Sequence, residues 1–417
     1  MAKTDIIVIG GGPAGLMAAG QAAEMGATVL LLEKMESPGR KLLLTGKNRC
    51  NLTNTDSIQQ ALKHFNRDGR FLTQLYYRFF EPELRSFFAN LGLPTVELRG
   101  GRVFPVSEKA ADVLQTLLTW AAKSGVRLQT SESVRDLIIE NGKIGGVRTD
   151  DETYFSSAVI LAAGGKAYPG TGSTGDGYQL AEAAGHTIQD PFPALVPLVT
   201  AGDTAQKLQG LSLKNVLVSL YLNGKKETDL FGEMLFTHFG LSGPVILTLS
   251  RQVVLALKEN KKVEIQIDLK PALDHPALDQ RIIRDIQDQG RKQFSTLLSG
   301  LLPGALIPIC VEQTGVPWDK TVSQLTSEDR SALRNWLKDD FRFEVLDHRG
   351  FEQAIITAGG VHVAEVDAHT MQSKLVEGLY FAGEILNLDG DTGGYNLQAA
   401  FSTGWAAGRA AGSALQG

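Results

Sequence analysis

The sequence has little cysteine, and its histidines do not fall into metal-binding spacings. Its 417 residues include two cysteines, Cys50 and Cys310, which lie far apart and form no C-x-x-C pair. A disulfide-stabilised secreted fold and a zinc site are therefore not indicated. The seven histidines show no H-x-x-x-H or comparable spacing, so we predict no metal site.

Long apolar runs are also lacking. The longest apolar stretch, residues 297–310, is interrupted by Pro303 and Pro308. A membrane-spanning helix needs about 20 consecutive apolar residues, so we expect no transmembrane segment and no membrane partner. The first predicted strand begins too close to Met1 to leave room for a signal peptide. Cytoplasmic residence is the default expectation.

Positive charge is not in excess. The net charge is −5, with 43% hydrophobic and 21% charged residues, which is typical of globular proteins. We therefore expect no DNA partner, although a local basic patch can still bind RNA. The length is sufficient for two or three domains.

The stretch 5–33 is the most informative part of the chain. Residues 6–9 are β-branched and apolar, as in a strand that is buried on both faces. Gly10, Gly12 and Gly15 follow as G-x-G-x-x-G, and an Ala-rich helix is predicted up to Glu24. A second buried strand at 28–32 completes a β–α–β unit. This order of elements is typical of dinucleotide binding.

The three glycines have separate physical roles in such a site. Gly10 permits the tight turn, Gly12 lets the backbone approach a pyrophosphate, and Gly15 lets the helix pack close to the strand. Free N–H groups at the helix start favour the anionic phosphates. Glu33 is placed to accept hydrogen bonds from ribose hydroxyls, and its charge argues against a 2′-phosphate there.

The next segment, 36–54, is rich in Gly, Asn and Thr and carries four basic residues. We predict a loop that lines the cofactor, with a solvated basic loop as the alternative. Residues 40–85 hold nine basic and four acidic residues with interleaved aromatics. An RNA-binding face and an amphipathic helix with aromatics facing the core both remain open.

The middle of the chain alternates between element types. We predict a helix at 110–123 and several short strands over 126–161, with Asn141-Gly142 as a hairpin turn. Gly170, Gly172 and Gly175 repeat the glycine spacing, but no strand leads directly into them. We expect a Gly-rich loop that caps a helix, with Thr174 or Asp176 near its start.

A second part of the chain begins after a proline-rich boundary at 191–197. Residues 199–268 read mostly as short alternating strands, interrupted by Leu235 to Pro244. Residues 271–338 have helical periodicity.

The C-terminal segment returns to cofactor chemistry. An apolar strand at 379–382 precedes Gly383-Glu384, and Gly393-Gly394 precede an Ala- and Gly-rich helix from Asn396. This second Gly-rich helix start can present backbone amides to a polar group. Two separated helix starts suit a long ligand such as FAD better than NAD.

Several segments resemble one family closely: VIGGGPAGLMAA, PGRKLLLTGKNRCNLTN, GRVFPVS, GGKAYPGTGSTGDGY, LFTHFGLSGP, TAGGV and LYFAGEILNLDGDTGGYNLQAAFSTG. Over nearly its whole length the chain resembles the bacterial aminoacetone oxidase-like flavoproteins, also labelled BaiN/RdsA-type NAD(P)/FAD-dependent oxidoreductases. These are relatives of the fumarate reductase and L-aspartate oxidase flavoproteins. One departure is clear: the family's loop usually reads S-G-G-G-R-C-N, whereas this chain has Lys47 and Asn48 at two of the glycines.

The resemblance implies an α/β fold with a Rossmann-type FAD-binding domain built from both chain ends. It also implies an inserted β-barrel-like domain and a helical subdomain. We expect the FAD-binding domain at 1–194 and 355–417, the barrel-like insert at 195–270 and 339–354, and the helical subdomain at 271–338. FAD is expected to bind non-covalently, with NADH or NADPH as a transient reductant.

Two functions stay open under this resemblance. One is NAD(P)H-linked reduction of a C=C bond, with uridine in ribosomal RNA as a possible substrate. The other is oxidation of a small aminoacetone-like amine with oxygen as acceptor. We expect the substrate to enter between the FAD domain and the insert, with His238 and the Ser242-Gly243 turn facing it. The alternative for His238 is a satisfied structural histidine.

Cys50 is the candidate proton donor, because Arg49 beside it would favour a thiolate. Its alternative role is that of a small apolar residue packed against the flavin ring. The predicted cofactor-binding residues are Gly10, Gly12, Pro13, Ala14, Gly15, Glu33, Lys34, Arg40, Lys41, Thr45, Gly46, Asn48, Arg49, Cys50, Asn51, Ala163, Gly164, Gly165, Gly383, Glu384, Gly393, Gly394, Tyr395, Asn396 and Leu397.

Overall fold

A parallel five-stranded sheet forms the centre of the first part of the molecule. The structure is a computed structural model that describes residues 4–65 and 68–415. The strand order is β19-β10-β1-β2-β6, and all four pairings are parallel. The strands are β1 (Ile6–Ile9), β2 (Val29–Leu32), β6 (Arg127–Gln129), β10 (Ala158–Leu161) and β19 (Leu379–Phe381). Because β19 comes from the other end of the chain, the predicted Rossmann-type domain built from both chain ends is confirmed.

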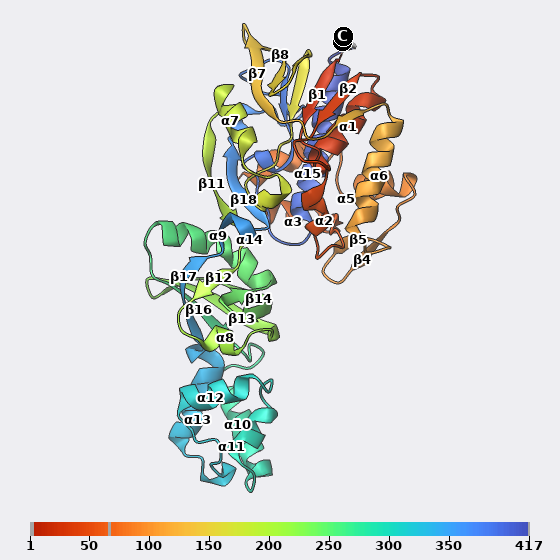
Figure 1. The fold of residues 1–417 in the computed structure, drawn as a ribbon. Coiled ribbons are helices and arrows are strands. Elements are labelled where there is room, and N and C mark those ends of the chain that lie inside the picture. Colours follow the sequence, from red (N-terminus) through yellow and green to blue (C-terminus); the bar gives the residue numbers. More distant parts are fainter. Residues whose placement is uncertain (1–3, 66–67, 416–417) are drawn as a thin grey trace. The chain divides into compact units, whose positions relative to one another are not determined.

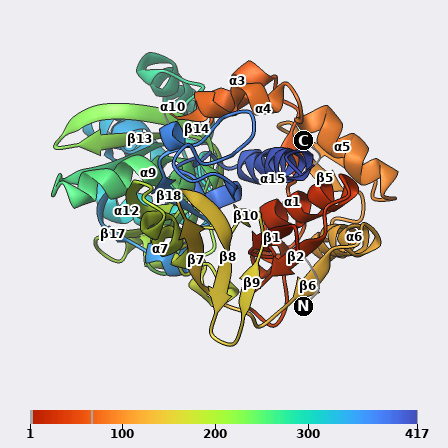
Figure 2. The same cartoon turned by 90° about the horizontal axis from the view of Figure 1, so that it is seen from above.

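Two helices pack beside this sheet, α1 (Pro13–Glu24) and α15 (Tyr395–Ser413), and they lie side by side in Figures 1 and 2. The contact is close because α15 presents glycines to the backbone of α1. A Cβ atom on Gly404 would overlap the carbonyl oxygen of Ala14, and one on Gly408 would overlap that of Ala18. Since residue numbers rise together along both helices, the two helices are parallel.

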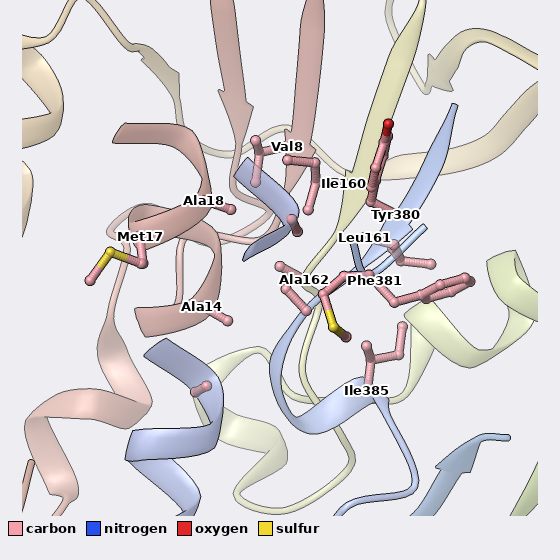
Figure 3. Packing of buried hydrophobic residues seen from close by; sticks show 14 of the residues in the cluster. Val8, Ala14, Met17, Ala18, Ile160, Leu161, Ala162, Tyr380, Phe381 and Ile385 are labelled. Carbon is pink, nitrogen blue, oxygen red and sulfur yellow. The ribbon is translucent and has the colours of Figure 1, made fainter. Parts of the chain in front are cut away.

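The core between sheet and helices is made of small and branched side chains. Figure 3 shows Ala14, Met17 and Ala18 of α1 in the same cluster as Ile160 and Leu161 of β10. The four residues of β1 and of β2 are all buried, as the sequence pattern predicted. Continuous apolar strands are the expected pattern for a parallel sheet that is covered on both faces.

Shorter elements surround this core within the same compact unit, which comprises residues 1–194 and 351–417. Strands β3, β5 and β4 form one antiparallel sheet, β7, β8 and β9 a second, and β11 pairs with β18. Their bounds, with those of the helices, are α2 (Arg40–Leu44), β3 (Thr53–Asn54), α3 (Ile58–Lys63), α4 (Thr73–Tyr76), α5 (Glu81–Asn90), β4 (Thr95–Leu98), β5 (Arg102–Pro105), α6 (Ala110–Lys123), β7 (Val134–Glu140), β8 (Lys143–Thr149), β9 (Thr153–Phe155), α7 (Asp176–Ala183), β11 (Ile188–Ala194), α14 (Gly350–Gln353) and β18 (Ile356–Val361).

The second compact unit, residues 195–350, contains a closed six-stranded barrel and a group of helices. The barrel order is β12-β15-β14-β13-β16-β17, and both parts are drawn in Figure 1. Their bounds are β12 (Leu198–Thr200), α8 (Thr204–Lys207), β13 (Ser212–Leu222), β14 (Lys225–Thr237), β15 (Gly240–Ser242), α9 (Pro244–Lys258), β16 (Val263–Asp268), α10 (His275–Gln289), α11 (Phe294–Ser299), α12 (Leu306–Thr314), α13 (Ser327–Asn335) and β17 (Arg342–His348). The predicted barrel and helical parts of the fold are confirmed.

A buried ion pair joins the barrel to its helices. Lys338 lies in the π-helical turn Trp336–Asp340, and its Nζ is 2.6 Å from Asp268 Oδ2 at the end of β16. The same ammonium group donates to the backbone oxygens of Lys270, at 3.1 Å, and Leu273, at 2.7 Å. All three N–H donors of this buried cation therefore have partners.

Several sequence expectations were wrong in detail. Residues 199–268 are not mostly short strands, because β13 and β14 have 11 and 13 residues and α9 is a 15-residue helix. Leu235 to Pro244 does not interrupt the strands, since it contains the end of β14, the turn and β15. The Gly-rich loop before α7 was predicted correctly, since α7 begins at Asp176 and its cap is Gly175 in a left-handed conformation without a side-chain cap. The compact units divide after residue 350, before the expected return at 355.

Among the described residues, no helix combines the length and apolar character needed to cross a bilayer.

Candidate functional site

The first glycine-rich turn has the geometry of a pyrophosphate cradle. Gly10 has φ +103°, and a Cβ there would lie 2.5 Å from the carbonyl oxygen of Ala162. A Cβ on Gly15 would overlap the carbonyl oxygen of Gly10, so both positions require glycine for packing. Gly12 differs, because a Cβ there would meet no atom within 4 Å. The open space at Gly12, beside the start of α1, is where a phosphate can approach the backbone.

Glu33 lies beside this turn, at the end of β2. Its Oε2 accepts a hydrogen bond from the Gly11 N–H at 2.8 Å, and its Oε1 accepts one from the Met35 N–H at 2.8 Å. Each carboxylate oxygen keeps a lone pair for a further donor. The carboxylate is thus fixed next to the glycine turn and can accept from ribose hydroxyls.

Two predicted cofactor-binding lysines are held by acids from distant parts of the chain. Lys41 Nζ lies 2.6 Å from Glu384 Oε2, and Glu384 Oε1 accepts from the Thr357 N–H at 2.9 Å. Lys34 Nζ lies 2.6 Å from Asp176 Oδ2 and also contacts the Thr174 hydroxyl. The structure therefore brings Lys41 and Glu384 together, although 343 residues separate them.

The loop 45–51 has an unusual backbone. Lys47, Asn48 and Cys50 have φ values of 58°, 65° and 63°, and Gly46 has φ 59°. Left-handed conformations are uncommon for residues other than glycine. The two positions at which the sequence departs from the glycines of its family thus keep a glycine-like backbone. The Asn48 carbonyl anchors the loop by accepting from the Ala110 N–H at 2.8 Å.

Two buried polar atoms, one at the last residue of this loop and one just after it, have no hydrogen-bond partner in the described part of the chain. They are Asn51 Oδ1 and Thr53 Oγ1. A buried acceptor or hydroxyl without a partner costs about 1–3 kcal/mol, so such atoms usually meet a ligand or water. They fit a polar ligand that covers this loop.

Cys50 is fully buried, and burial raises the pKa of its thiol to about 12, although a hydrogen bond with Thr45 acts in the opposite direction. The expectation that Arg49 favours a thiolate was therefore wrong. The Arg49 guanidinium instead lies 3.2 Å from Glu108 and stacks over the Phe104 ring at 4.7 Å. Cys50 packs here as a small apolar residue, and its role as proton donor stays a prediction.

The second glycine-rich helix start lies against strand β3. A Cβ on Gly394, which has φ +107°, would overlap the carbonyl oxygen of Thr53. Asn54 Nδ2 donates to the Gly393 carbonyl at 3.2 Å, which ties the turn to the segment after the loop 45–51. The Asn396 side chain also stabilises this turn. Its Oδ1 accepts a hydrogen bond from the Gly390 N–H, and its Nδ2 donates one to the Gly390 carbonyl, both at 2.8 Å.

Sequence reasoning missed a cluster of titratable groups at this helix start. His64 Nδ1 lies 2.9 Å from Asp391 Oδ2, and its ring stacks on Tyr395 at a centroid distance of 4.2 Å. The Tyr395 hydroxyl donates to Asp56 Oδ2 at 2.6 Å. His64 and Asp391 are 327 residues apart and lie in no shared motif. The one available signal was that Asp391 lies two residues before the predicted Gly393-Gly394 turn.

The remaining predicted residues divide between the two compact units. Gly164, with φ +74°, and Gly165 follow β10, and a Cβ on Gly165 would contact Thr357 and Glu384. Arg40 begins α2 next to Lys41. His238 belongs to the other unit, where it is exposed in the turn between β14 and β15 and packs edge-on against Phe239 at 4.9 Å. Its expected role at the substrate, like the expected point of substrate entry, stays a prediction.

The stretch 40–85 forms several short elements rather than one amphipathic helix. Most of its aromatic side chains are buried, among them Phe65, Tyr76, Phe79 and Phe80. Tyr77 is the exception, with 64% of its surface exposed.

Comparisons with known proteins agree with this architecture. Residues 4–410 match the family model described as the HI0933-like protein Rossmann domain. The chain is 34% identical over 406 residues to a 3-dehydro-bile acid delta(4,6)-reductase of Clostridium scindens, covering 97% of this chain and 98% of that protein. It is 30% identical over 407 residues to a ribosomal RNA dihydrouridine synthase of Haemophilus influenzae, covering 97% of each chain.

A solved flavocytochrome c3 fumarate reductase has a similar fold. The comparison has a TM-score of 0.54 at 16% identity and covers 99% of this chain and 78% of that one.

Proposed function

Because the chain belongs to the HI0933-like family of Rossmann-type flavoproteins and is an FAD-dependent oxidoreductase, we propose that it reduces a carbon–carbon double bond conjugated with a carbonyl group. The observation that carries the FAD assignment is the pair of glycine-rich helix starts at Gly12 and Gly394. When bound, FAD supplies the hydride chemistry, and the protein supplies binding and orientation.

The chain's own residues fit this cofactor at both ends. The open position at Gly12 and the carboxylate of Glu33 suit the pyrophosphate and a ribose. The unpartnered Asn51 Oδ1 and Thr53 Oγ1, with the turn at Gly393-Gly394, suit the polar edge of a flavin ring. These residues belong to a single compact unit, so the fit does not depend on the placement of the barrel.

The proposed substrate class follows from what two relatives have in common. One is named as a reductase of 3-dehydro-bile acids and the other as a dihydrouridine synthase of ribosomal RNA. A 3-oxo-4,6-diene and the C5–C6 bond of uridine are both double bonds conjugated with a carbonyl. The carbonyl draws electrons from the far carbon, which makes that carbon a hydride acceptor.

The test is an anaerobic two-step experiment on the FAD-loaded protein. NADH and NADPH are added separately, and bleaching of the flavin absorbance identifies the electron donor. The reduced protein is then mixed with a 3-oxo-4,6-diene bile acid, with ribosomal RNA from a strain that lacks the gene, or with oxygen. Reoxidation by the bile acid or the RNA supports double-bond reduction. Reoxidation by oxygen alone refutes it and favours an amine oxidase, with aminoacetone as the donor to test.

A surface on the FAD-binding unit provides the control that separates RNA from a small substrate. The guanidinium groups of Arg78 and Arg409 lie over the Trp405 ring, at 5.0 and 5.2 Å, beside the exposed Tyr77. Basic groups attract phosphates, and aromatic side chains stack on unpaired bases. If RNA is the substrate, the double variant Arg78→Glu/Arg409→Glu should slow reoxidation by RNA at least tenfold. Reoxidation by the bile acid should stay unchanged.

A further inference from the structure

Reduction of a conjugated double bond requires the transfer of a hydride and of a proton to the substrate. One carbon receives a hydride, and the neighbouring carbon receives a proton from an acid. When bound, FAD would supply the hydride, and a nicotinamide nucleotide is the expected source of its electrons, so the electrons balance. The sequence offered Cys50 as the acid, but that thiol is fully buried and its pKa is raised to about 12. It is a weak acid that cannot exchange its proton with water directly.

The cluster at the start of α15 holds a better-placed proton. His64 lies between two carboxylates, with Nδ1 at 2.9 Å from Asp391 Oδ2 and Nε2 at 3.6 Å from Asp56 Oδ2. Its ring lies on the face of Tyr395 with an interplanar angle of 15°. The His64 side chain is 38% exposed, so it can regain a proton from water after each cycle.

The cluster is fixed to the glycine turn by backbone contacts as well. The Asp391 N–H donates to the His64 carbonyl at 2.8 Å, and Phe65 forms an isolated antiparallel bridge with Gly390. Gly390 and Asp391 also bind the side chain of Asn396, the residue after Tyr395. These contacts hold His64 against residues 390–396, the segment proposed to bind the flavin end of the cofactor.

Tyr395, which stacks on the His64 ring, does not release its proton near neutral pH. Burial, together with the hydrogen bond to Asp56, raises the pKa of the Tyr395 phenol far above its ordinary value. The Tyr395 phenol therefore stays protonated, and its O–H group donates a hydrogen bond to Asp56. Histidine is the side chain that ordinarily changes charge between about pH 5 and 8. A carboxylate at Nδ1 fixes the ring orientation and supports the imidazolium, as in other acid–base sites.

We propose that His64 is the acid that delivers the proton to the substrate double bond, with Asp391 and Tyr395 as its positioning residues. This assignment rests on the proposed function. In the step, a C–H bond forms at the carbon that does not receive the hydride, and the imidazolium N–H bond breaks. Neutral His64 then takes up a proton from water. Among the described residues, Asp56, Asp391 and Tyr395 are the titratable groups that contact the ring.

The test compares the FAD-loaded wild-type protein with His64→Gln, Asp391→Asn and a control. The control is His275→Gln, because His275 also pairs with an aspartate, Asp339 at 3.1 Å, but belongs to the other compact unit. Each protein is reduced by the nucleotide that serves the wild type, and reoxidation by a 3-oxo-4,6-diene bile acid and by ribosomal RNA is followed. General acid catalysis contributes about 10²–10⁴-fold, so His64→Gln should slow reoxidation at least hundredfold. Reduction by the nucleotide should change less than twofold.

Two further readouts distinguish an acid from a structural residue. The pH profile of the reoxidation rate should differ between the wild type and His64→Gln. Added imidazole should restore part of the rate in His64→Ala. FAD is also titrated into the FAD-free proteins, and its dissociation constant is measured by flavin fluorescence. This constant should differ less than threefold between His64→Gln and the wild type. A tenfold weaker affinity would mean that His64 positions the cofactor and would overturn the assignment.

The outcomes separate the two proposals. A wild-type protein that neither substrate reoxidises refutes the proposed function, and the His64 assignment with it. An active wild type with His64→Gln equally fast refutes the His64 assignment alone. A slow His64→Gln with an unchanged pH profile and no imidazole rescue also refutes it.

Discussion

Two glycines of the first turn allow the effects on cofactor binding and on folding to be measured separately. At each position, a Gly→Ala substitution adds a single methyl group. Gly12 has φ −78° and ψ −177°, an extended conformation that alanine adopts without strain. A Cβ there meets no atom within 4 Å. Gly12→Ala should therefore leave the FAD-free protein as stable as the wild type, or more stable by about 0.4–1 kcal/mol through reduced unfolded-state entropy. The added methyl group instead occupies the space that suits the pyrophosphate.

Gly15→Ala should have the opposite effect. Its Cβ would overlap the Gly10 carbonyl oxygen and lie 3.1 Å from the Gly10 carbonyl carbon, so α1 must move away from β1. Overpacking of this kind costs about 1–3 kcal/mol. The FAD-free protein should lose that stability in urea unfolding. Gly12→Ala should instead weaken FAD binding at least tenfold, which corresponds to about 1.4 kcal/mol.

The measurement uses FAD-free protein, because bound cofactor stabilises the folded state by mass action. Urea unfolding gives stability, and quenching of FAD fluorescence gives affinity. Gly304→Ala is the matched control, since Gly304 also has open space around a Cβ but belongs to the other compact unit. It should change neither quantity. The reasoning fails if Gly12→Ala binds FAD within twofold of the wild type, or if it destabilises the FAD-free protein by more than about 1 kcal/mol.

Three other predictions concern single side chains. Cys50 should resist alkylation by iodoacetamide at pH 7.5 in the folded protein and react after unfolding, because burial raises its pKa to about 12; rapid labelling of the native thiol would contradict this. Lys338→Met should lower the stability of the barrel unit by about 3–5 kcal/mol in urea unfolding, since it leaves Asp268 buried without its cation, and adding Asp268→Leu should recover part of the loss. Burial lowers the pKa of His186, against the opposing effect of Glu365, so the unfolded chain binds the proton first. Stability should fall as the pH drops below 6.5, by up to about 1.4 kcal/mol per unit, and His186→Gln should remove that contribution; equal slopes in both proteins would refute it.

The N-terminal β–α–β unit could be predicted from the sequence because its signals are local. Each element is marked by residues within four positions of one another, and the three glycines fall within one six-residue motif. The helix α9 carries an equally regular pattern, with buried Val245, Ile246, Leu249 and Val253 at helical spacing. It was missed because five of its 15 residues are β-branched and because strands precede and follow it. Pro244 at its first turn was the signal that could have identified it.

The candidate site was only half predictable, and the missing half depends on contacts between distant residues. Motif spacing located Gly12, Glu33 and Gly394, which are proposed to bind the cofactor through their backbone or through a single carboxylate. The ion pair of Lys41 with Glu384 and the contact of His64 with Asp391 join residues more than 300 positions apart. No local periodicity encodes such pairs. The burial of Cys50, which raises the pKa of its thiol, could not be predicted from the sequence either.

The parallel packing of α1 and α15 sets the distance between the two glycine-rich turns at which these helices begin. Gly404 of α15 is level with Ala14 of α1. Helix α15 begins nine residues before Gly404, whereas α1 begins one residue before Ala14, so the two starts are offset by eight residues. At about 1.5 Å per residue the offset is roughly 12 Å along the shared direction. Both helix starts present N–H groups toward the same end, and the start of α15 lies beyond that of α1 in this direction. Because the glycines fix the register of the two helices, the step is part of the fold, and it favours a ligand with an anionic centre and a separate polar ring.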